Sequence, residues 1–171
     1  MYIADFQPKD LSTHIVKKET PEQEVGNAIH DYLSRQTHFP LTEEDVNTWK
    51  IEDSQPYSTE IREALRCIAR HTEWHPYFAD GVKVLNEVSI LPTWEFLQQN
   101  VREGEVRPKI TFRPDRIVQL ADAVVVLDYK TGHPTEKVRE EYERQVATYV
   151  ELLRDMSLGP VRGEVLYLNE M

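Results

Sequence analysis

A run of four consecutive apolar residues, 124–127, leads directly into Asp128-Tyr129-Lys130. Such a run is typical of a short strand that is buried on both faces, so other elements must lie on both sides of it. The segment before it, 109–119, also has strand character, and a short turn near residues 121 and 122 separates the two. The pattern predicts a hairpin of strands 109–119 and 123–130 inside a layered domain.

Helices are predicted around this hairpin. Thr20, Pro21 and Gln23 form a capping pattern that begins a helix over 21–36. The other predicted elements are, in chain order, a short helix through Trp49, a helix over 58–73, a strand over 82–90, the hairpin, a helix over 135–155 and a strand over 161–168. This order predicts an α/β fold with a central mixed sheet flanked by helices.

The hairpin brings two carboxylates together. A turn centred between residues 121 and 122 places Asp115 opposite Asp128, with Cβ atoms about 4.5–5.5 Å apart. Like charges at this spacing destabilise a hairpin unless one is protonated or a cation lies between them. Because side chains alternate along a strand, Lys130 shares a face with Asp128. Two carboxylates and an ammonium group are therefore predicted to converge.

This cluster has the composition of a metal-dependent hydrolytic site. Carboxylate oxygens suit Mg²⁺ and Mn²⁺, which keep positions for a phosphate oxygen and a water. Lys130 can orient or deprotonate that water and offset charge on the phosphate. The alternative is a surface hairpin with Asp128 and Lys130 solvated and Asp115 capping a turn. The apolar run before Asp128 disfavours this alternative.

Composition narrows the class of protein. The 171 residues predict one domain, 20–171, preceded by an irregular lead-in over 1–19. A net charge of −10 disfavours binding of nucleic acid through a broad positive field, but it leaves a metal-dependent nuclease open. The single cysteine, Cys67, excludes an internal disulfide and a four-thiolate iron–sulfur cluster. With no long apolar run and no leader pattern, we expect no membrane association and a cytoplasmic location.

Two predicted helices carry polar residues beside apolar stripes. His30 borders the stripe of the first helix, and Gly26 one turn earlier leaves space for a close approach. Gln145 and Tyr149 lie on the inward stripe of the 135–155 helix. A border histidine is commonly structural, and a buried glutamine can simply bond the sheet backbone. The residues alone leave structural and functional interpretations open.

Taken in chain order, these motifs resemble the RecB-like branch of the PD-(D/E)xK nuclease superfamily. The motifs that carry the resemblance are Gly26-Asn27-Ala28-Ile29-His30, Asn86-Glu87-Val88, Phe112-Arg113-Pro114-Asp115-Arg116, Asp128-Tyr129-Lys130-Thr131-Gly132 and Gln145-Val146-Ala147-Thr148-Tyr149. Each is short, but all five occur in the family's order. Two features depart from the family: Phe112 replaces a glycine, and residues 92–108 are a candidate insertion that shapes the substrate groove.

The resemblance implies a restriction-endonuclease-like core and a Mg²⁺- or Mn²⁺-dependent deoxyribonuclease that acts as an exonuclease. In the family, the glutamate of the second motif stands at the start of a strand. The implied site residues are His30, Asp115 and Asp128 as metal ligands, Asp115, Asp128, Lys130, Gln145 and Tyr149 as catalytic residues, and Glu87, Arg116 and Tyr129 in second rank.

The resemblance also implies partners. Relatives of this kind end helicase–nuclease chains in DNA repair and recombination, so DNA and a helicase domain or subunit are the expected partners. A helicase that delivers the DNA strand to the nuclease is compatible with the acidic net charge of this chain. Two alternatives stay open: a non-catalytic DNA- or protein-binding module that keeps the nuclease fold, and a structural or regulatory subunit of a repair complex.

Overall fold

The computed structural model describes residues 19–52, 54–100, 111–156 and 159–169. Its elements are, in chain order, α1 (Pro21–Ser34), α2 (Glu43–Thr48), α3 (Ser58–Arg70), the 3-10 turn η2 (Thr72–Trp74), α4 (His75–Phe78), β1 (Lys83–Asn86), α5 (Trp94–Asn100), β2 (Arg116–Gln119), β3 (Val124–Lys130), α6 (Glu136–Asp155) and β4 (Val161–Tyr167). The lead-in, residues 1–19, lies outside the described residues except for its last position.

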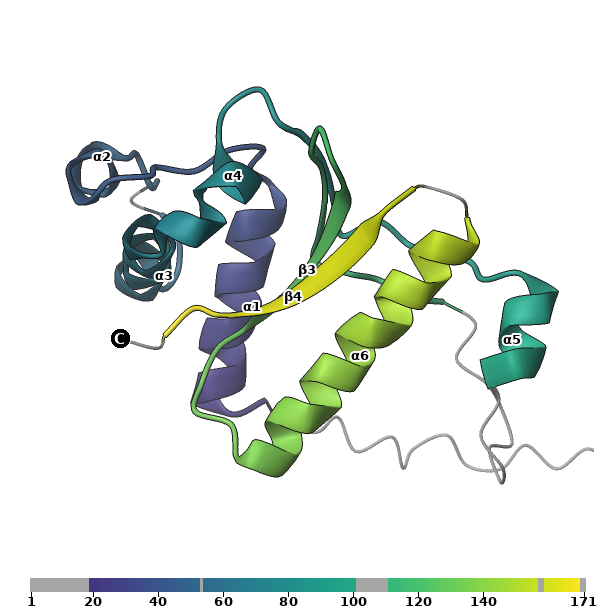
Figure 1. The fold of residues 1–171 in the computed structure, drawn as a ribbon. Coiled ribbons are helices and arrows are strands. Elements are labelled where there is room, and N and C mark those ends of the chain that lie inside the picture. Colours follow the sequence, from purple (N-terminus) through teal and green to yellow (C-terminus); the bar gives the residue numbers. More distant parts are fainter. Residues whose placement is uncertain (1–18, 53, 101–110, 157–158, 170–171) are drawn as a thin grey trace, which may run out of the picture.

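The four strands form one mixed sheet in the order β1-β2-β3-β4, and Figure 1 shows β3 and β4 side by side in it. The first three strands pair antiparallel, whereas β3 and β4 run parallel. Parallel neighbours need a long crossover, and α6 supplies it. Because β3 has a neighbour on each side, every residue from Val125 to Tyr129 is buried. The buried strand predicted from the apolar run is confirmed.

Helices cover both faces of the sheet. In Figure 1, α6 lies against one face, and α1, α3 and α4 lie on the other. Alternating side chains of β3 reach both cores: Val126 belongs to the same core as Val146 of α6, and Leu127 belongs to the same core as Leu33 of α1. This arrangement confirms the predicted α/β fold with a mixed sheet between helical layers.

Three helices differ little from prediction. α1 has the predicted capping box between Thr20 and Gln23, and it ends at Ser34 instead of residue 36. α6 begins at Glu136, close to the predicted 135. α3 is shorter than predicted, because His71 leaves the helical conformation with ψ 83° and the chain continues in η2. The structure describes no helix long and apolar enough to cross a membrane.

The strand predicted over 82–90 is interrupted. β1 ends at Asn86, and Glu87 has a positive φ of 52°, which a continuous strand does not allow. Pairing resumes only as an isolated bridge between Ile90 and Phe112. Glu87 therefore follows the end of a strand and does not stand at its start, contrary to the expectation from the family motif.

The strand predicted over 109–119 is also shorter, with β2 limited to Arg116–Gln119. Pro114 lacks a backbone N–H, so it cannot donate to a ladder. The side chain of Asp115 takes over the pairing, because its Oδ2 accepts a hydrogen bond of 2.5 Å from the backbone N–H of Tyr129. Asp115 thus lies immediately before β2 instead of within it.

A glycine lets α1 approach the end of β3. A Cβ atom added at Gly26 would lie only 2.8 Å from Oγ1 of Thr131, the residue after β3. A contact this short requires a shift in one of the two segments. The glycine thus permits the close approach that brings the next turn of α1, with His30, toward the sheet.

Candidate active site

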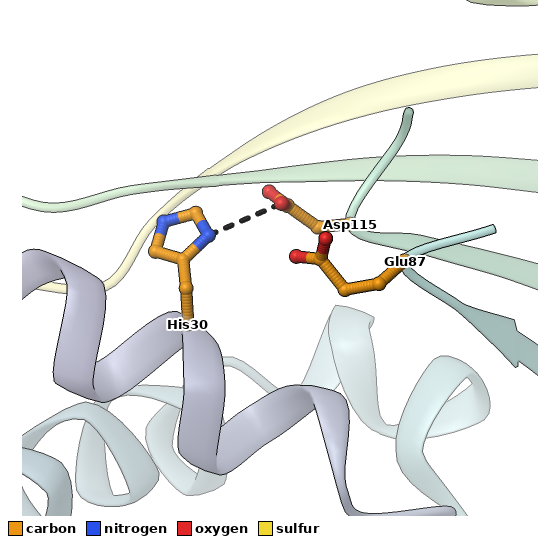
Figure 2. A group of neighbouring side chains, drawn as sticks. All are labelled: His30, Glu87 and Asp115. Carbon is orange, nitrogen blue, oxygen red and sulfur yellow. Dashed lines mark hydrogen bonds and ion pairs between the residues drawn. The ribbon is translucent and has the colours of Figure 1, made fainter. Parts of the chain in front are cut away.

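The carboxylate of Asp115 joins α1 to the hairpin. Its Oδ1 lies 3.1 Å from Nδ1 of His30 (Figure 2), while its Oδ2 holds the backbone of Tyr129. The register predicted for the hairpin is confirmed, since Arg116 pairs with Leu127 and Ile117 with Val126. Asp115 lies one residue before this ladder.

Glu87 points toward the same place. Figure 2 shows its carboxylate beside Asp115 and His30, and one ligand atom from each residue lies within 4.8 Å of the other two. Its positive φ lets the chain turn at the end of β1, and its backbone N–H donates to the carbonyl of Asp115. On the outer side, Arg113 forms an ion pair of 2.6 Å with the Glu87 carboxylate.

Asp128 and Lys130 form a second group on β3. The two share a face, as predicted, and Lys130 Nζ lies 2.5 Å from Asp128 Oδ2. Asp128 is only 3% exposed, so its carboxylate has lost nearly all contact with solvent. The Lys130 ammonium also lies over the ring of Tyr142 on α6, 4.5 Å from the centroid.

The carboxylates of the site are hard to ionise together. Burial raises the pKa of Asp128, and the charge of Asp115 raises it further against the opposing charge of Lys130. Burial and the charge of Asp115 likewise raise the pKa of Glu87, against the charge of Arg113. Charge accumulated in this way is relieved by a bound cation.

The pKa of His30 is raised as well, which for an imidazole favours the charged form. Burial alone would lower the pKa of its imidazole, but the hydrogen bond and charge of Asp115 outweigh burial and raise it. His30 also packs edge-on against the ring of Tyr129, with centroids 5.9 Å apart. Its ring is thus held between α1 and β3 with a nitrogen directed at Asp115.

Gln145 and Tyr149 lie together on α6. The amide Nε2 of Gln145 donates a 2.7 Å hydrogen bond to the hydroxyl of Tyr149, which in turn donates to the carbonyl of Arg113 at 3.4 Å. Burial raises the pKa of Tyr149, and the charges of Asp128 and other site carboxylates raise it further. The pair therefore anchors α6 to the segment that precedes Asp115.

Two residues of the predicted set have side chains directed elsewhere. The Arg116 guanidinium is completely buried and donates to the carbonyls of Gln36, Thr37 and Tyr77. The Tyr129 ring lies in the core formed with α1 and α3, and only its backbone N–H contacts the Asp115 carboxylate. The Arg116 side chain thus lies outside the group that surrounds Asp115 and Asp128, whereas the Tyr129 ring borders that group through its edge-on contact with His30.

Two contacts of the site were not anticipated from the sequence. Tyr142 falls on the same helical stripe as Gln145, which makes it inward-facing but does not reveal its contact with Lys130. The role of Arg113 could not be predicted, because its ion pair with Glu87 joins two segments that are distant in sequence.

A groove opens over this site. The residues that line it come from α1, β3, α6 and the Glu87 turn, and they are Glu22, Gln23, Gly26, Asn27, His30, Glu87, Tyr129, Lys130, Thr131 and Tyr142. His30, Glu87 and Lys130 thus face a common open space. Two carboxylates and an imidazole within 4.8 Å are a donor set that suits a hard divalent cation.

Comparison with protein families identifies the class of this chain. The family model described as the PD-(D/E)XK nuclease superfamily matches residues 5–170. This range contains all the residues of the site and all the elements of the sheet. No curated protein matches the chain.

Proposed function

The chain belongs to the PD-(D/E)XK nuclease superfamily, and on this premise we propose that it is a deoxyribonuclease that uses Mg²⁺ or Mn²⁺. The observation that carries the proposal is the convergence of His30, Glu87 and Asp115, with ligand atoms within 4.8 Å of one another. Beside them, Asp128 and Lys130 supply the remaining carboxylate and ammonium of the motif.

The donor set fits a divalent metal ion. His30, Asp115 and Asp128 are the proposed ligands, and the position of Glu87 supports its addition to them. Asp128 is a nearly fully buried carboxylate with a raised pKa, so a cation nearby would favour its ionised form. When bound, such an ion supplies Lewis acidity, which polarises a phosphate oxygen and makes water a better nucleophile.

Side chains of the protein would position the phosphate and the attacking water. The Lys130 ammonium lies at the groove and can donate hydrogen bonds to a phosphate oxygen or to the attacking water. In the hydrolysis, a P–O bond forms with water and the P–O3′ bond breaks. The water gives up a proton to solvent and the leaving O3′ takes one up from solvent, which leaves a 5′-phosphate and a 3′-hydroxyl. Lys130 remains protonated and offsets the negative charge that develops on the phosphate.

The biological setting is proposed from the RecB-like motifs. We propose an exonuclease within a helicase–nuclease, with residues 20–171 as one nuclease domain. Residues 92–108, of which 101–108 lie outside the described residues, are the proposed insertion. The acidic net charge of −10 supports this setting, because a helicase domain or subunit would supply the affinity for the DNA strand. DNA repair and recombination are the processes in which such an assembly acts.

The test is cleavage of end-labelled DNA. Linear and circular DNA, single-stranded and duplex, is incubated with Mg²⁺, Mn²⁺ or EDTA, and the wild type is compared with Asp128→Asn and Lys130→Met. We expect metal-dependent cleavage that both substitutions reduce by at least about 100-fold, and that requires a free end. Circular substrates cut as fast as linear ones would refute the exonuclease assignment.

Absence of cleavage under every metal condition, with a folded wild type, would refute catalysis by this chain alone. Calorimetric titration with Mn²⁺ then separates two cases. A site that binds Mn²⁺ and loses the ion in Asp128→Asn indicates a nuclease that needs its helicase. A chain that binds DNA but no Mn²⁺ would be a non-catalytic module with the nuclease fold.

A further inference from the structure

Lys130 is held from two sides. One side is the Asp128 carboxylate, 2.5 Å from Nζ, and the other is the ring face of Tyr142, whose centroid is 4.5 Å from Nζ. The Lys130 side chain is 19% exposed, so it still reaches the groove. An ammonium on a flexible four-carbon side chain has three N–H donors and many rotamers. These two contacts restrict both the rotamer and the directions in which the donors point.

Tyr142 reaches this position from a different part of the fold. It lies on α6, one turn before Gln145, and it lines the groove together with Lys130. α6 is packed against the sheet through residues such as Val146 and Leu152, so the backbone that carries the ring is fixed. The ring is therefore presented to the ammonium from a fixed backbone.

The ring face, not the hydroxyl, makes the contact with Lys130. An aromatic face attracts a cation through its quadrupole, and the attraction grows where solvent is partly excluded. A phenylalanine ring would preserve this interaction, whereas the smaller aliphatic side chain of leucine would keep an apolar group at the position without attracting the charge. This difference separates a role in positioning the cation from a role in packing.

We propose that Tyr142 is a positioning residue for the catalytic Lys130: its ring holds the ammonium beside Asp128 and leaves one donor direction toward the groove. This inference rests on the proposed nuclease function, and it adds a residue that the nuclease motifs quoted above do not include. Tyr142 acts through Lys130 and does not itself touch the reacting phosphate.

The experiment compares Tyr142→Phe, Tyr142→Trp and Tyr142→Leu with the wild type in steady-state cleavage of linear DNA. We expect Tyr142→Phe and Tyr142→Trp to keep kcat within about twofold, and Tyr142→Leu to lower kcat by about 2–30-fold with little change in KM. Thermal unfolding of all variants should agree within a few degrees. Equal kcat in the phenylalanine and leucine variants would overturn the proposal.

A second measurement does not depend on activity. The aromatic ring shifts the NMR signals of the Lys130 ε-methylene protons upfield, and Lys130→Arg identifies those signals by their loss. We expect the shift to persist in Tyr142→Phe and to disappear in Tyr142→Leu. If both variants keep the wild-type signals, Tyr142 does not hold Lys130 and the proposal is wrong.

The two measurements separate failure of this inference from failure of the proposed function. A wild type without metal-dependent cleavage would contradict the proposed function of the isolated chain, and the NMR signals alone would then decide the contact between Tyr142 and Lys130. An active wild type whose leucine variant is equally active would leave the nuclease intact and refute only the role of Tyr142.

Discussion

Asp115 and His30 are 85 residues apart in the sequence, yet their side chains meet at 3.1 Å and link α1 to the sheet. The contact has two consequences. It orients the imidazole toward the carboxylates, and it stabilises the protonated form of His30, whose pKa is raised because the interaction with Asp115 outweighs the effect of burial. A divalent metal ion binds the neutral imidazole, so proton and metal would compete at His30 if it is a ligand, as proposed.

Metal affinity should therefore rise with pH through the raised pKa of His30, which is above the ordinary value of 6.5. Titration calorimetry with Mn²⁺ at a series of pH values, in buffers of different ionisation enthalpy, measures both the affinity and the protons released. We expect His30→Asn to bind Mn²⁺ more weakly, and we expect its Mn²⁺ affinity not to rise with pH around the pKa of His30. A variant with the wild-type pH profile would show that His30 is not the titrating ligand.

The stability of the metal-free protein should change in the opposite direction. A group with a raised pKa in the folded state contributes stability that is complete below its unfolded pKa and is lost as the pH rises through its folded pKa. The contribution of His30 is thus present below about pH 6.5 and disappears above that value. Urea unfolding in EDTA should show this loss in the wild type and not in His30→Asn.

Glu87→Gln should weaken Mn²⁺ binding by about 10-fold or more and reduce cleavage, because an amide replaces a carboxylate beside His30 and Asp115. Glu22→Gln is the matched control, since Glu22 lines the same groove but belongs to the exposed first turn of α1. Mn²⁺ calorimetry on both variants is the measurement. Equal affinities in the two variants would exclude Glu87 from the metal site.

Much of this fold was predictable because it depends on local patterns. The apolar run before Asp128 predicts a strand that is covered on both faces, and the short turn near residues 121 and 122 fixes the register of the hairpin. The capping box between Thr20 and Gln23 fixes the beginning of α1. Each of these features involves residues close in sequence.

The positions that prediction missed depend on long-range contacts or on backbone conformation. The positive φ of Glu87, which ends β1, has no signature in a residue that is not glycine or asparagine. Side-chain alternation, by contrast, does predict that Arg116 points away from Asp115 and that Tyr129 points away from Asp128. Family motifs list neighbours together, although consecutive strand residues face opposite layers.

Substitution of Arg113 and of Arg116, which lie on either side of Asp115, should lower the free energy of unfolding by different amounts. Arg116→Met should destabilise the protein by about 3–5 kcal/mol, because it leaves the carbonyls of Gln36 and other partners of the buried guanidinium without a donor. Arg113 is 60% exposed, so Arg113→Met should cost less than about 1 kcal/mol.

Urea unfolding of the two variants, with equal m-values, measures this difference. If both variants lose a comparable free energy of unfolding, the Arg116 guanidinium is not a structural anchor of the core. A stable Arg116→Met protein that binds DNA more weakly would instead return Arg116 to the functional site.

The approach of α1 to β3 can be tested with a double-mutant cycle on Gly26 and Thr131. Alanine is a better helix former than glycine by about 0.5–1 kcal/mol, but a Cβ at position 26 would lie 2.8 Å from Thr131 Oγ1. We expect Gly26→Ala to destabilise the wild type by about 1 kcal/mol, since overpacking exceeds the gain in helix propensity.

In a Thr131→Ala background the expected sign reverses. Apart from the chain neighbours of Gly26 and the surrounding backbone of α1, Oγ1 of Thr131 is the one atom within 4 Å of the added Cβ among the described residues. Its removal relieves the overlap, so Gly26→Ala should then stabilise by about 0.5–1 kcal/mol. The coupling measured by unfolding in urea should therefore exceed about 1 kcal/mol. Additive effects would show that α1 does not lie against the end of β3 and that His30 is positioned by other contacts.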